Sequence, residues 1–339
     1  MKKDPRKQFI DAVNKEYLKC SACGECRRVC PVYEATGTEK NVARGRLALV
    51  KALADGEMEL TDPIKESVGN CLLCMACVAN CAGQVNMVDI VLKSRAYMIS
   101  EKSLSRVKAL ALKTLTCKRK YQDMGAASAR AAQLVLMAKL PEKSGLRFKL
   151  SLPRFFEIRQ KGLPPIAKHP FIGRQDREYK AAHQTQEVLL FVGCAGNYIY
   201  TQIAKKTIQL LNRLDVGVKV LSSQGCCGAP AHAHADTNTL ETLAKNNIHA
   251  FSTPLKQPII TICSSGGLML KKQYPQIFQG TRLAARAVAV SRRTMDISEY
   301  LTEQVGIEKI ISRIKQKITL PLTYHDPCHL ARGQQITAQ

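Results

Sequence analysis

The chain has 339 residues, which is enough for two or three domains, and it carries a formal net charge of +24. This excess of Lys and Arg suggests an anionic partner such as an acidic protein subunit, an acidic lipid surface or a nucleic acid. Aromatic residues make up only 5% of the chain and Trp is absent, which argues against nucleic acid because base stacking needs aromatic side chains. No apolar run approaches the roughly 18 residues of a membrane-spanning helix. The charged start MKKDPRKQFI predicts no signal peptide, so we expect a cytoplasmic protein.

Residues 1–100 are predicted to form a helical domain. Apolar residues recur at helical spacing in 9–18, 41–55 and 87–99, and Thr61-Asp62-Pro63 is typical of a helix start. Loops rich in cysteine connect these helices. The helical spacer between the two loops is long enough to bring the second loop back beside the first.

Eight cysteines in this domain form the same C-x2-C-x2-C-x3-C motif twice. The first motif is Cys20, Cys23, Cys26 and Cys30, and the second is Cys71, Cys74, Cys77 and Cys81. In two-cluster ferredoxins the first three cysteines of such a motif hold one [4Fe–4S] cluster, and the fourth reaches the other cluster. We therefore assign Cys20, Cys23, Cys26 and Cys81 to the first cluster. The second cluster takes Cys71, Cys74, Cys77 and Cys30.

Two other uses of these cysteines, structural zinc and disulfides, agree less well with the sequence. Structural zinc typically takes two separated cysteine pairs, and disulfides need an oxidising compartment. Pro31 follows Cys30 as expected for this motif, whereas Ala82 follows Cys81. The thiolates and not the proline are the ligands, so this difference does not change the assignment.

Residues 101–185 are predicted to form a basic connector. Lys, Arg and Leu alternate through 102–120 in the pattern of a basic amphipathic helix, which either packs on its own domain or lies on a membrane surface. Cys117 lies in this stretch without cysteine neighbours, as is typical of an inert apolar side chain. Pro153, Pro164 and Pro165 mark an irregular segment before the next domain.

An α/β pattern begins near residue 186. Strand-like runs at 188–192, 216–221, 258–262 and 320–324 alternate with helical segments at 198–214, 236–251 and 267–278. Alternation of this kind predicts a mostly parallel sheet covered by helices.

Five further cysteines each follow one of these predicted strands. They are Cys194, Cys226, Cys227, Cys263 and Cys328. Ligands of open α/β sheets bind beyond the carboxyl ends of the strands, so this placement indicates a site, whereas the alternative is a set of inert buried cysteines. His232, His234, His325 and His329 lie nearby, and they either tune a metal or are ordinary polar loop residues.

The double ferredoxin motif followed by a C…CCG…C arrangement resembles the family of cysteine-rich CCG-domain electron carriers. This family includes the iron–sulfur subunit of glycolate oxidase, the corresponding subunit of anaerobic glycerol-3-phosphate dehydrogenase, and heterodisulfide reductase. Ala43-Arg44-Gly45-Arg46 and His325-Asp326-Pro327-Cys328-His329 resemble the glycolate oxidase branch in particular. The resemblance covers nearly the whole chain.

The resemblance implies a multidomain protein. An α-helical dicluster ferredoxin domain over 1–100 and a connector over 101–185 precede an α/β CCG domain with a mostly parallel sheet over 186–318. Residues 319–339 resemble the start of a second, truncated CCG repeat. The resemblance also implies that Cys194, Cys226, Cys227 and Cys263 hold a further iron–sulfur cluster, with Cys328 as the opening cysteine of the second repeat. Cys263-Ser264-Ser265-Gly266 lacks the final cysteine of the C-x-x-C that often ends the family pattern.

The sequence contains no glycine-rich nucleotide motif and no readable catalytic triad or carboxylate pair. We therefore expect an electron carrier without its own substrate-oxidising centre. The resemblance implies the iron–sulfur subunit of a flavin-linked 2-hydroxy-acid dehydrogenase acting on glycolate or D-lactate. Its partners would be an FAD-binding oxidase subunit and a quinone or other membrane acceptor, with peripheral contact on the inner face of the cytoplasmic membrane. The alternative is a heterodisulfide reductase-like subunit that acts on a disulfide through the CCG cluster.

Overall fold

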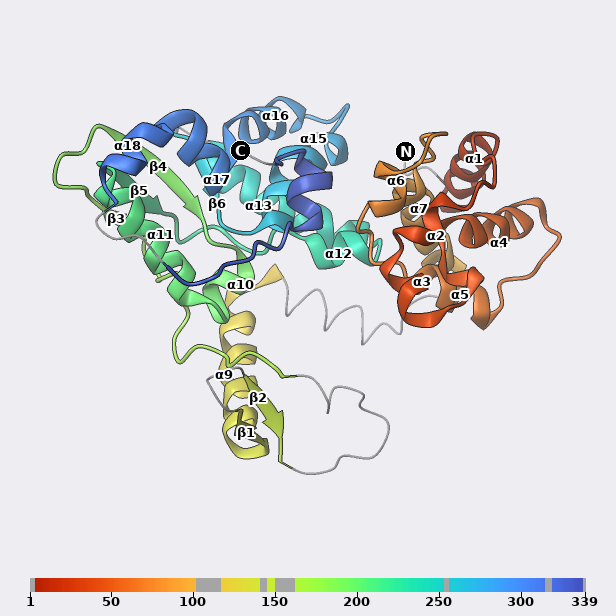
Figure 1. Cartoon of the computed structure of the whole chain (residues 1–339), viewed down its shortest axis with the longest axis horizontal. Helices are drawn as coiled ribbons and strands as arrows, with labels where there is room; N and C mark the ends of the chain where they lie inside the picture. The colour runs from red at the N-terminus through yellow and green to blue at the C-terminus, as the bar shows by residue number, and fades with distance from the viewer. Residues whose placement is uncertain are drawn as a thin grey trace. The chain divides into compact units, whose positions relative to one another are not determined.

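A computed structural model describes residues 4–101, 117–140, 145–149, 162–252, 256–314 and 319–337. The chain divides into two compact units (Figure 1). The first unit combines residues 1–110 with 228–240 and 324–338, and the second combines 111–227 with 241–323. Two short segments from the later half of the chain therefore fold with the N-terminal region.

The first unit is helical, as predicted. Its elements are α1 (Pro5–Tyr17), α2 (Glu25–Arg28), α3 (Pro31–Thr36), η1 (Glu39–Asn41), α4 (Ala43–Asp55), α5 (Asp62–Gly69), α6 (Ala76–Ala79), α7 (Met87–Glu101), α12 (Ala229–Ala233) and the π-helical segment η6 (His329–Gln334). The predicted helices at 9–18, 41–55 and 87–99 correspond to α1, α4 and α7. Helix α1 begins at Pro5 because the Asp4 side chain accepts a hydrogen bond from the backbone N–H of Arg6.

The core of the first unit is formed by the apolar stripes of α1, α4, α5 and α7. Phe9, Val50, Ile64 and Ile90 are each at most 1% exposed and belong to one hydrophobic cluster. Other members of the cluster, such as Val13 in α1 and Val68 in α5, lie three or four residues from them, which places the apolar side chains on one face of each helix. This core holds the cysteine loops at the ends of the helices.

The second unit contains a five-stranded sheet with the order β3-β5-β4-β6-β7. The strands are β3 (Arg177–Tyr179), β4 (Gln186–Phe191), β5 (Val216–Val220), β6 (Ile259–Thr261) and β7 (Thr294–Asp296). Strands β5, β4, β6 and β7 are parallel, and β3 is antiparallel to β5. The prediction of a mostly parallel sheet is thus confirmed.

Helices cover both faces of this sheet. The helical segments of the second unit are α9 (Arg119–Leu136), α10 (Gly193–Tyr198), α11 (Thr201–Arg213), α13 (Thr237–Ser252), α14 (Ser264–Leu268), η4 (Met269–Gln273), α15 (Tyr274–Ile277), α16 (Ala284–Arg293), α17 (Ile297–Tyr300), η5 (Leu301–Val305) and α18 (Ile307–Ser312). Of these, α9 lies beside a hairpin of β1 (Met137–Lys139) and β2 (Leu146–Phe148), away from the sheet (Figure 1). Val188 packs with Ile208 of α11 on one face, and Phe191 packs edge-on against Phe251 of α13 on the other. Because side chains alternate along a strand, β4 is buried on both faces.

The predicted strand at 320–324 is wrong. These residues form no strand, and Leu320, Leu322 and Tyr324 are 71%, 77% and 73% exposed. A strand needs a neighbour for its backbone hydrogen bonds, and none of the strands in the described part of the chain pairs with this segment. Cys328 therefore does not follow a strand, although the other four cysteines of that set do.

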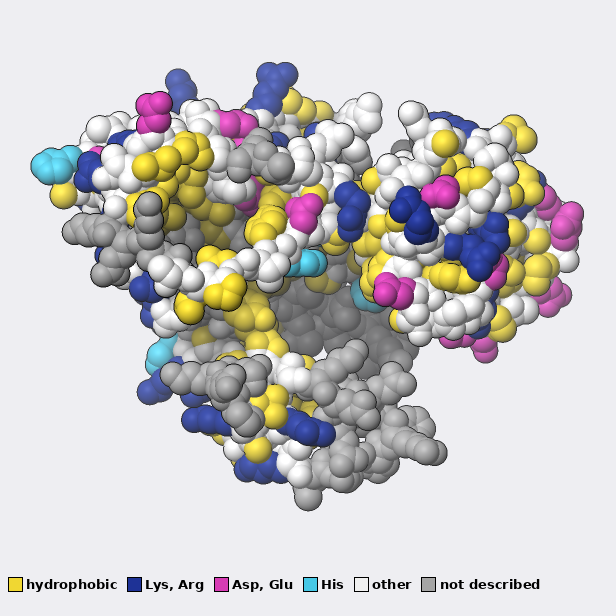
Figure 2. All heavy atoms as spheres, viewed as in Figure 1, with side chains coloured by type: hydrophobic (Ala, Val, Ile, Leu, Met, Phe, Trp, Pro, Cys, Tyr) yellow, Lys and Arg dark blue, Asp and Glu magenta, His cyan; other side chains and the backbone are white. Residues whose placement is uncertain are grey.

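The amphipathic helix predicted at 102–120 lies mostly outside the described residues. Within the residues that the structure does describe, no helix is both long enough and apolar enough to cross a membrane. Figure 2 shows Lys and Arg side chains scattered among other residue types on the visible faces of both units. On these faces the positive charge does not gather into one continuous patch.

Gly45 permits helix α4 to lie against η1. A Cβ atom added at Gly45 would overlap the carbonyl oxygen of Glu39, whereas one added at Gly69 meets nothing within 4 Å. We expect Gly45→Ala to cost about 2–4 kcal/mol in the free energy of unfolding, because the helix must move away from η1. Gly69→Ala is the matched control and should change stability by less than about 1 kcal/mol. Thermal denaturation followed by circular dichroism compares the two, and equal melting temperatures would contradict this account.

Candidate iron–sulfur sites

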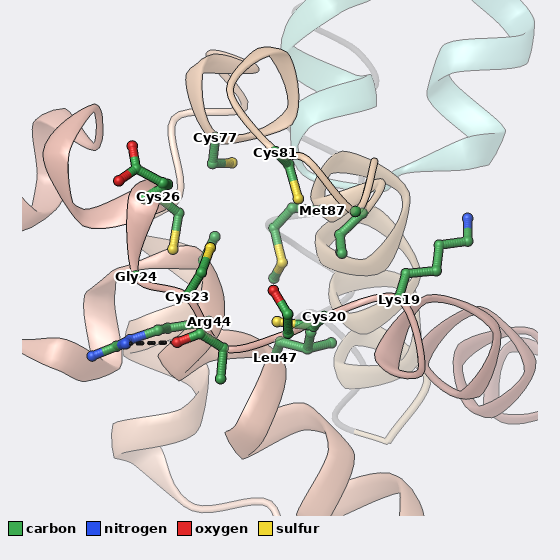
Figure 3. A pocket seen from close by; sticks show the side chains of 16 residues that line it. Lys19, Cys20, Cys23, Gly24, Cys26, Arg44, Leu47, Cys77, Cys81 and Met87 are labelled. Atoms are coloured by element: carbon green, nitrogen blue, oxygen red, sulfur yellow. Dashed lines mark hydrogen bonds between the residues drawn. The ribbon is translucent and has the colours of Figure 1, made fainter.

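The first candidate site is a cavity in the helical unit. Five cysteines line it, namely Cys20, Cys23, Cys26, Cys77 and Cys81. Figure 3 shows these side chains arranged around a common space, from the first turn of α2 and the loop before it and from the segment around α6. Leu47 and Met87, which are 2% and 3% exposed, complete an apolar wall.

The second candidate site is a neighbouring cavity in the same unit. Its cysteines are Cys30, Cys71, Cys74 and Cys77. Cys77 lines both cavities. The fourth cysteine of each motif thus lies with the first three of the other motif, since Cys30 lines the second cavity and Cys81 the first.

The two cysteine motifs share a strained backbone conformation. Ala22 and Leu73, which precede the second cysteine of each motif, have φ of 55° and 54°. Gly24 and Met75, which follow that cysteine, have φ of 89° and 61°. Left-handed conformations cost non-glycine residues about 1–2 kcal/mol each, and such strain concentrates at functional sites. The repeated conformation curls each motif around its cavity.

Burial raises the pKa of the Cys26 thiol, and it raises the pKa of the Cys77 thiol to about 12. Metal ligation requires thiolates, so cluster binding at these residues must release protons. In the described part of the chain, no three His, Cys, Asp or Glu side chains are close enough to hold a single metal ion. A [4Fe–4S] cubane instead bonds its four cysteines to four different iron atoms, which separates the sulfur ligands further.

A buried arginine provides a test of whether the second cavity fits an anionic cluster. Arg46 lines that cavity and is 2% exposed. Its Nε donates to the carbonyl oxygen of Ser67 at 2.7 Å, but its Nη2 has no hydrogen-bond partner among the described residues. A buried cation needs a compensating negative charge. Four thiolates around a cluster supply one, so the residues present fit a [4Fe–4S] cluster.

The third candidate site lies at the carboxyl edge of the sheet in the second unit. Cys194 follows β4 at the start of α10, Cys226 and Cys227 lie in the loop after β5, and Cys263 caps α14 directly after β6. Because β5, β4 and β6 are adjacent and parallel, the structure brings the three loops to one edge. A hydrogen bond with the Cys226 thiol raises the pKa of Cys194.

Buried polar side chains hold the double-cysteine loop. Asn247 and Tyr274 are both fully buried. Asn247 accepts a hydrogen bond from the N–H of Gly225 at 2.9 Å and donates to the carbonyl oxygen of Cys226 at 2.9 Å. The Tyr274 hydroxyl donates to the carbonyl oxygen of Cys227 at 3.0 Å. The backbone on both sides of the two thiols is therefore fixed from α13 and α15.

Cys328 and all four histidines noted in the sequence belong to the first unit, with the dicluster cavities. Cys328 is half-buried and immediately precedes η6. Burial lowers the pKa of His232, and the charge of His329 acts in the same direction. Asn247, Tyr274 and Arg95, which donates to the carbonyl oxygen of Cys71 at 2.7 Å, were not predicted, because the sequence has no local signal for them. Arg46 belongs to the Ala43-Arg44-Gly45-Arg46 motif noted in the sequence, but no function was predicted for its side chain.

Two family models match the chain. A 4Fe-4S dicluster domain matches residues 16–85, and a cysteine-rich domain of the CCG type matches residues 188–271. The chain is therefore an iron–sulfur protein with a dicluster domain followed by a cysteine-rich domain, and the resemblance found in the sequence is confirmed.

Two curated relatives resemble the chain over most of its length, and a third resembles it over less than half. It is 27% identical to the probable glycolate oxidase iron-sulfur subunit of Bacillus subtilis over 93% of this chain and 71% of the relative. It is also 27% identical to the glycolate oxidase iron-sulfur subunit of Escherichia coli over 94% of this chain and 72% of the relative. Lactate utilization protein A of Anoxybacillus flavithermus is 30% identical over 43% of this chain and 58% of the relative. No solved structure matches the chain significantly.

Proposed function

We propose that this chain is the iron–sulfur electron-transfer subunit of a flavin-linked 2-hydroxy-acid dehydrogenase, with glycolate or D-lactate as the acid. The relatives that are subunits of glycolate oxidase and the lactate utilization proteins support this class of substrate. An FAD-binding oxidase subunit would oxidise the acid. A quinone or another membrane acceptor would take the electrons, with this chain peripheral to the inner face of the cytoplasmic membrane.

The proposal includes two [4Fe–4S] clusters with crossed ligands. Cys20, Cys23, Cys26 and Cys81 would hold the first cluster, and Cys71, Cys74, Cys77 and Cys30 would hold the second. The observation that supports this most strongly is the exchange of the fourth cysteines between the two cavities. Bound clusters supply one-electron transfer, which matches the single-electron steps of a flavin.

A third cluster would be held by Cys194, Cys226, Cys227 and Cys263. Support comes from the convergence of their three loops at one sheet edge and from the hydrogen bond between the thiols of Cys194 and Cys226. Asn247 and Tyr274 would orient the two central ligands by holding their carbonyl groups. The Cys328 thiol is not assigned to this set.

The proposed division of labour predicts that the anaerobically reconstituted chain alone oxidises neither glycolate nor D-lactate. Adding the FAD-binding oxidase subunit should produce reduction of a dye or a quinone, because the flavin supplies the substrate chemistry. Dye bleaching with each acid measures both results, and the Cys74→Ser variant is the control with one site impaired. Substrate turnover by the pure chain without added flavin would contradict the proposal. Thiol release from a heterodisulfide without a hydroxy acid would instead favour a heterodisulfide reductase-like subunit.

A further inference from the structure

The motif Ala43-Arg44-Gly45-Arg46 directs one arginine to each dicluster cavity. It forms the first turn of α4, where two positions of separation turn side chains about 200° apart around the helix axis. Arg44 lines the first cavity and Arg46 lines the second. The two side chains are chemically identical, so any difference in their effect on the two cavities comes from their surroundings.

The positive charges at the first cavity are neutralised by carboxylates. Arg44 forms an ion pair with Glu39, and its Nη1 also donates to the carbonyl oxygen of Ala22 at 3.1 Å. Lys19, the other cation that lines this cavity, pairs with Glu16 at 2.8 Å. Glu39 also pairs with Arg27 at 3.6 Å. A cluster at this site would therefore lie beside cationic side chains that each have a carboxylate partner.

The positive charge of Arg46 at the second cavity has no such partner. Its hydrogen-bond acceptor is the neutral carbonyl of Ser67, and Nη2 is buried without an acceptor in the described structure. Arginine stays protonated in proteins, so this charge is permanent. Exclusion from water lessens the screening of its field.

A second arginine lies behind the cysteine loop of the same cavity. Arg95 of α7 donates to the carbonyl oxygens of Val68, Gly69 and Cys71 at 2.9, 3.0 and 2.7 Å. Its partners, like that of Arg46, are neutral carbonyls and not carboxylates. Burial lowers the pKa of Arg95, the nearby Cys71 thiol raises it, and the charge of Arg46 lowers it. Arg332 adds a hydrogen bond to the carbonyl oxygen of Cys74 at 2.8 Å.

We propose that Arg46 is a positioning residue that raises the reduction potential of the cluster held by Cys30, Cys71, Cys74 and Cys77 above that of the other cluster. This inference rests on the proposed pair of clusters. A nearby positive charge stabilises the reduced cluster because reduction adds one negative charge. An electron supplied by the flavin partner would therefore reside mainly on the cluster of the second cavity before it passes to the acceptor. Arg95 and Arg332 donate hydrogen bonds to the loop that holds this cluster. The order of the two clusters follows from an asymmetry within one four-residue motif.

The test is an anaerobic redox titration of the reconstituted full chain with dithionite, followed by electron paramagnetic resonance. Cys23→Ser and Cys74→Ser variants assign the two signals. In the wild-type chain, the second cluster should become reduced at the higher potential. Arg46→Gln should lower the ratio of reduced to oxidised second cluster at a fixed potential at least tenfold, which is 59 mV for one electron. The first cluster should change less than twofold.

Two further variants separate charge from shape. Arg46→Lys keeps the positive charge and should keep the ratio for the second cluster within about threefold of wild type. Arg44→Gln is the matched control from the same motif, and it should leave that ratio within twofold because Arg44 faces the first cavity. A purely structural role of Arg46 at Ser67 would alter iron content or stability without this selective shift in potential.

Several outcomes would overturn the inference. If Arg46→Gln retains both clusters and the ratio for the second cluster stays within twofold of wild type, Arg46 does not set its potential. If Arg46→Gln fails to assemble, the wild-type titration decides, and reduction of the first cluster at the higher potential overturns the inference. A wild-type chain that assembles fewer than two cubanes overturns the proposed function instead, and this inference with it.

Discussion

Cys74→Ser is expected to remove or convert one cluster and to lower the iron content of the chain by up to about four atoms, the content of one cubane. Cys74 lines only the second cavity, whereas the first cavity retains Cys20, Cys23, Cys26 and Cys81. The electron paramagnetic resonance signal of the first cluster should therefore persist. Iron analysis and spectroscopy of the anaerobically prepared protein measure both effects.

The same experiment tests the crossed ligands. Cys30→Ser should weaken the signal that Cys74→Ser removes, and Cys81→Ser should weaken the signal that Cys23→Ser removes. Cys117→Ser is a control, since this cysteine lines neither dicluster cavity. Uncrossed pairing of the losses would refute the ligand assignment, and stoichiometric zinc without reducible iron would refute the clusters altogether.

Asn247→Ala is expected to lower the free energy of unfolding of the second unit by about 3 kcal/mol. The substitution leaves the N–H of Gly225 and the carbonyl of Cys226 without their buried partner, and each unsatisfied group costs about 1–3 kcal/mol. Asn246 lies next to it on α13 but is exposed, so Asn246→Ala should change stability by less than about 0.5 kcal/mol. Urea unfolding followed by circular dichroism compares the two variants.

The rate at which Cys226 and Cys227 are alkylated provides a local measurement for the same two variants. Cys226 and Cys227 are 7% and 6% exposed, so they should react slowly with an alkylating reagent in the cluster-free protein. Loss of the Asn247 side chain should speed their labelling, because the loop backbone is no longer fixed. Equal stability and equal labelling rates in the Asn246 and Asn247 variants would mean that the buried network does not hold the loop.

The sequence predicts those features that depend on local spacing. Apolar periodicity in α1, α4 and α7 and the cysteine intervals are properties of a few neighbouring residues, so they can be identified without the fold. The strands β3 and β7 escape notice because each has only three residues, at least one of them charged, so neither shows the apolar run that marks β6. The apolar alternation of Leu320, Leu322 and Tyr324 looks the same with or without a neighbouring strand, so the sequence alone cannot exclude a strand there.

In the candidate sites too, features set by local spacing could be predicted and features set by tertiary packing could not. The cysteines are evident from the chain, but the residues that control their surroundings are not. Arg46 is identified by its burial and by its Nη2, which has no acceptor among the described residues. Asn247 is identified by contacts with a loop more than twenty positions away. Such contacts arise only from tertiary packing, for which one sequence carries no direct signal.

The first unit is built from segments that are far apart in the sequence, and this has a consequence for its biosynthesis. Its contacts include the hydrogen bond from Arg95 to the carbonyl of Ala233 at 2.5 Å and that from Arg332 to the carbonyl of Cys74. Both join residues that leave the ribosome far apart in time. The N-terminal cysteine loops therefore emerge long before the segments that complete their unit. Contacts of such large sequence separation slow folding, so the thiols of a nascent chain remain open to oxidants until residues 228–240 and 324–338 have been synthesised.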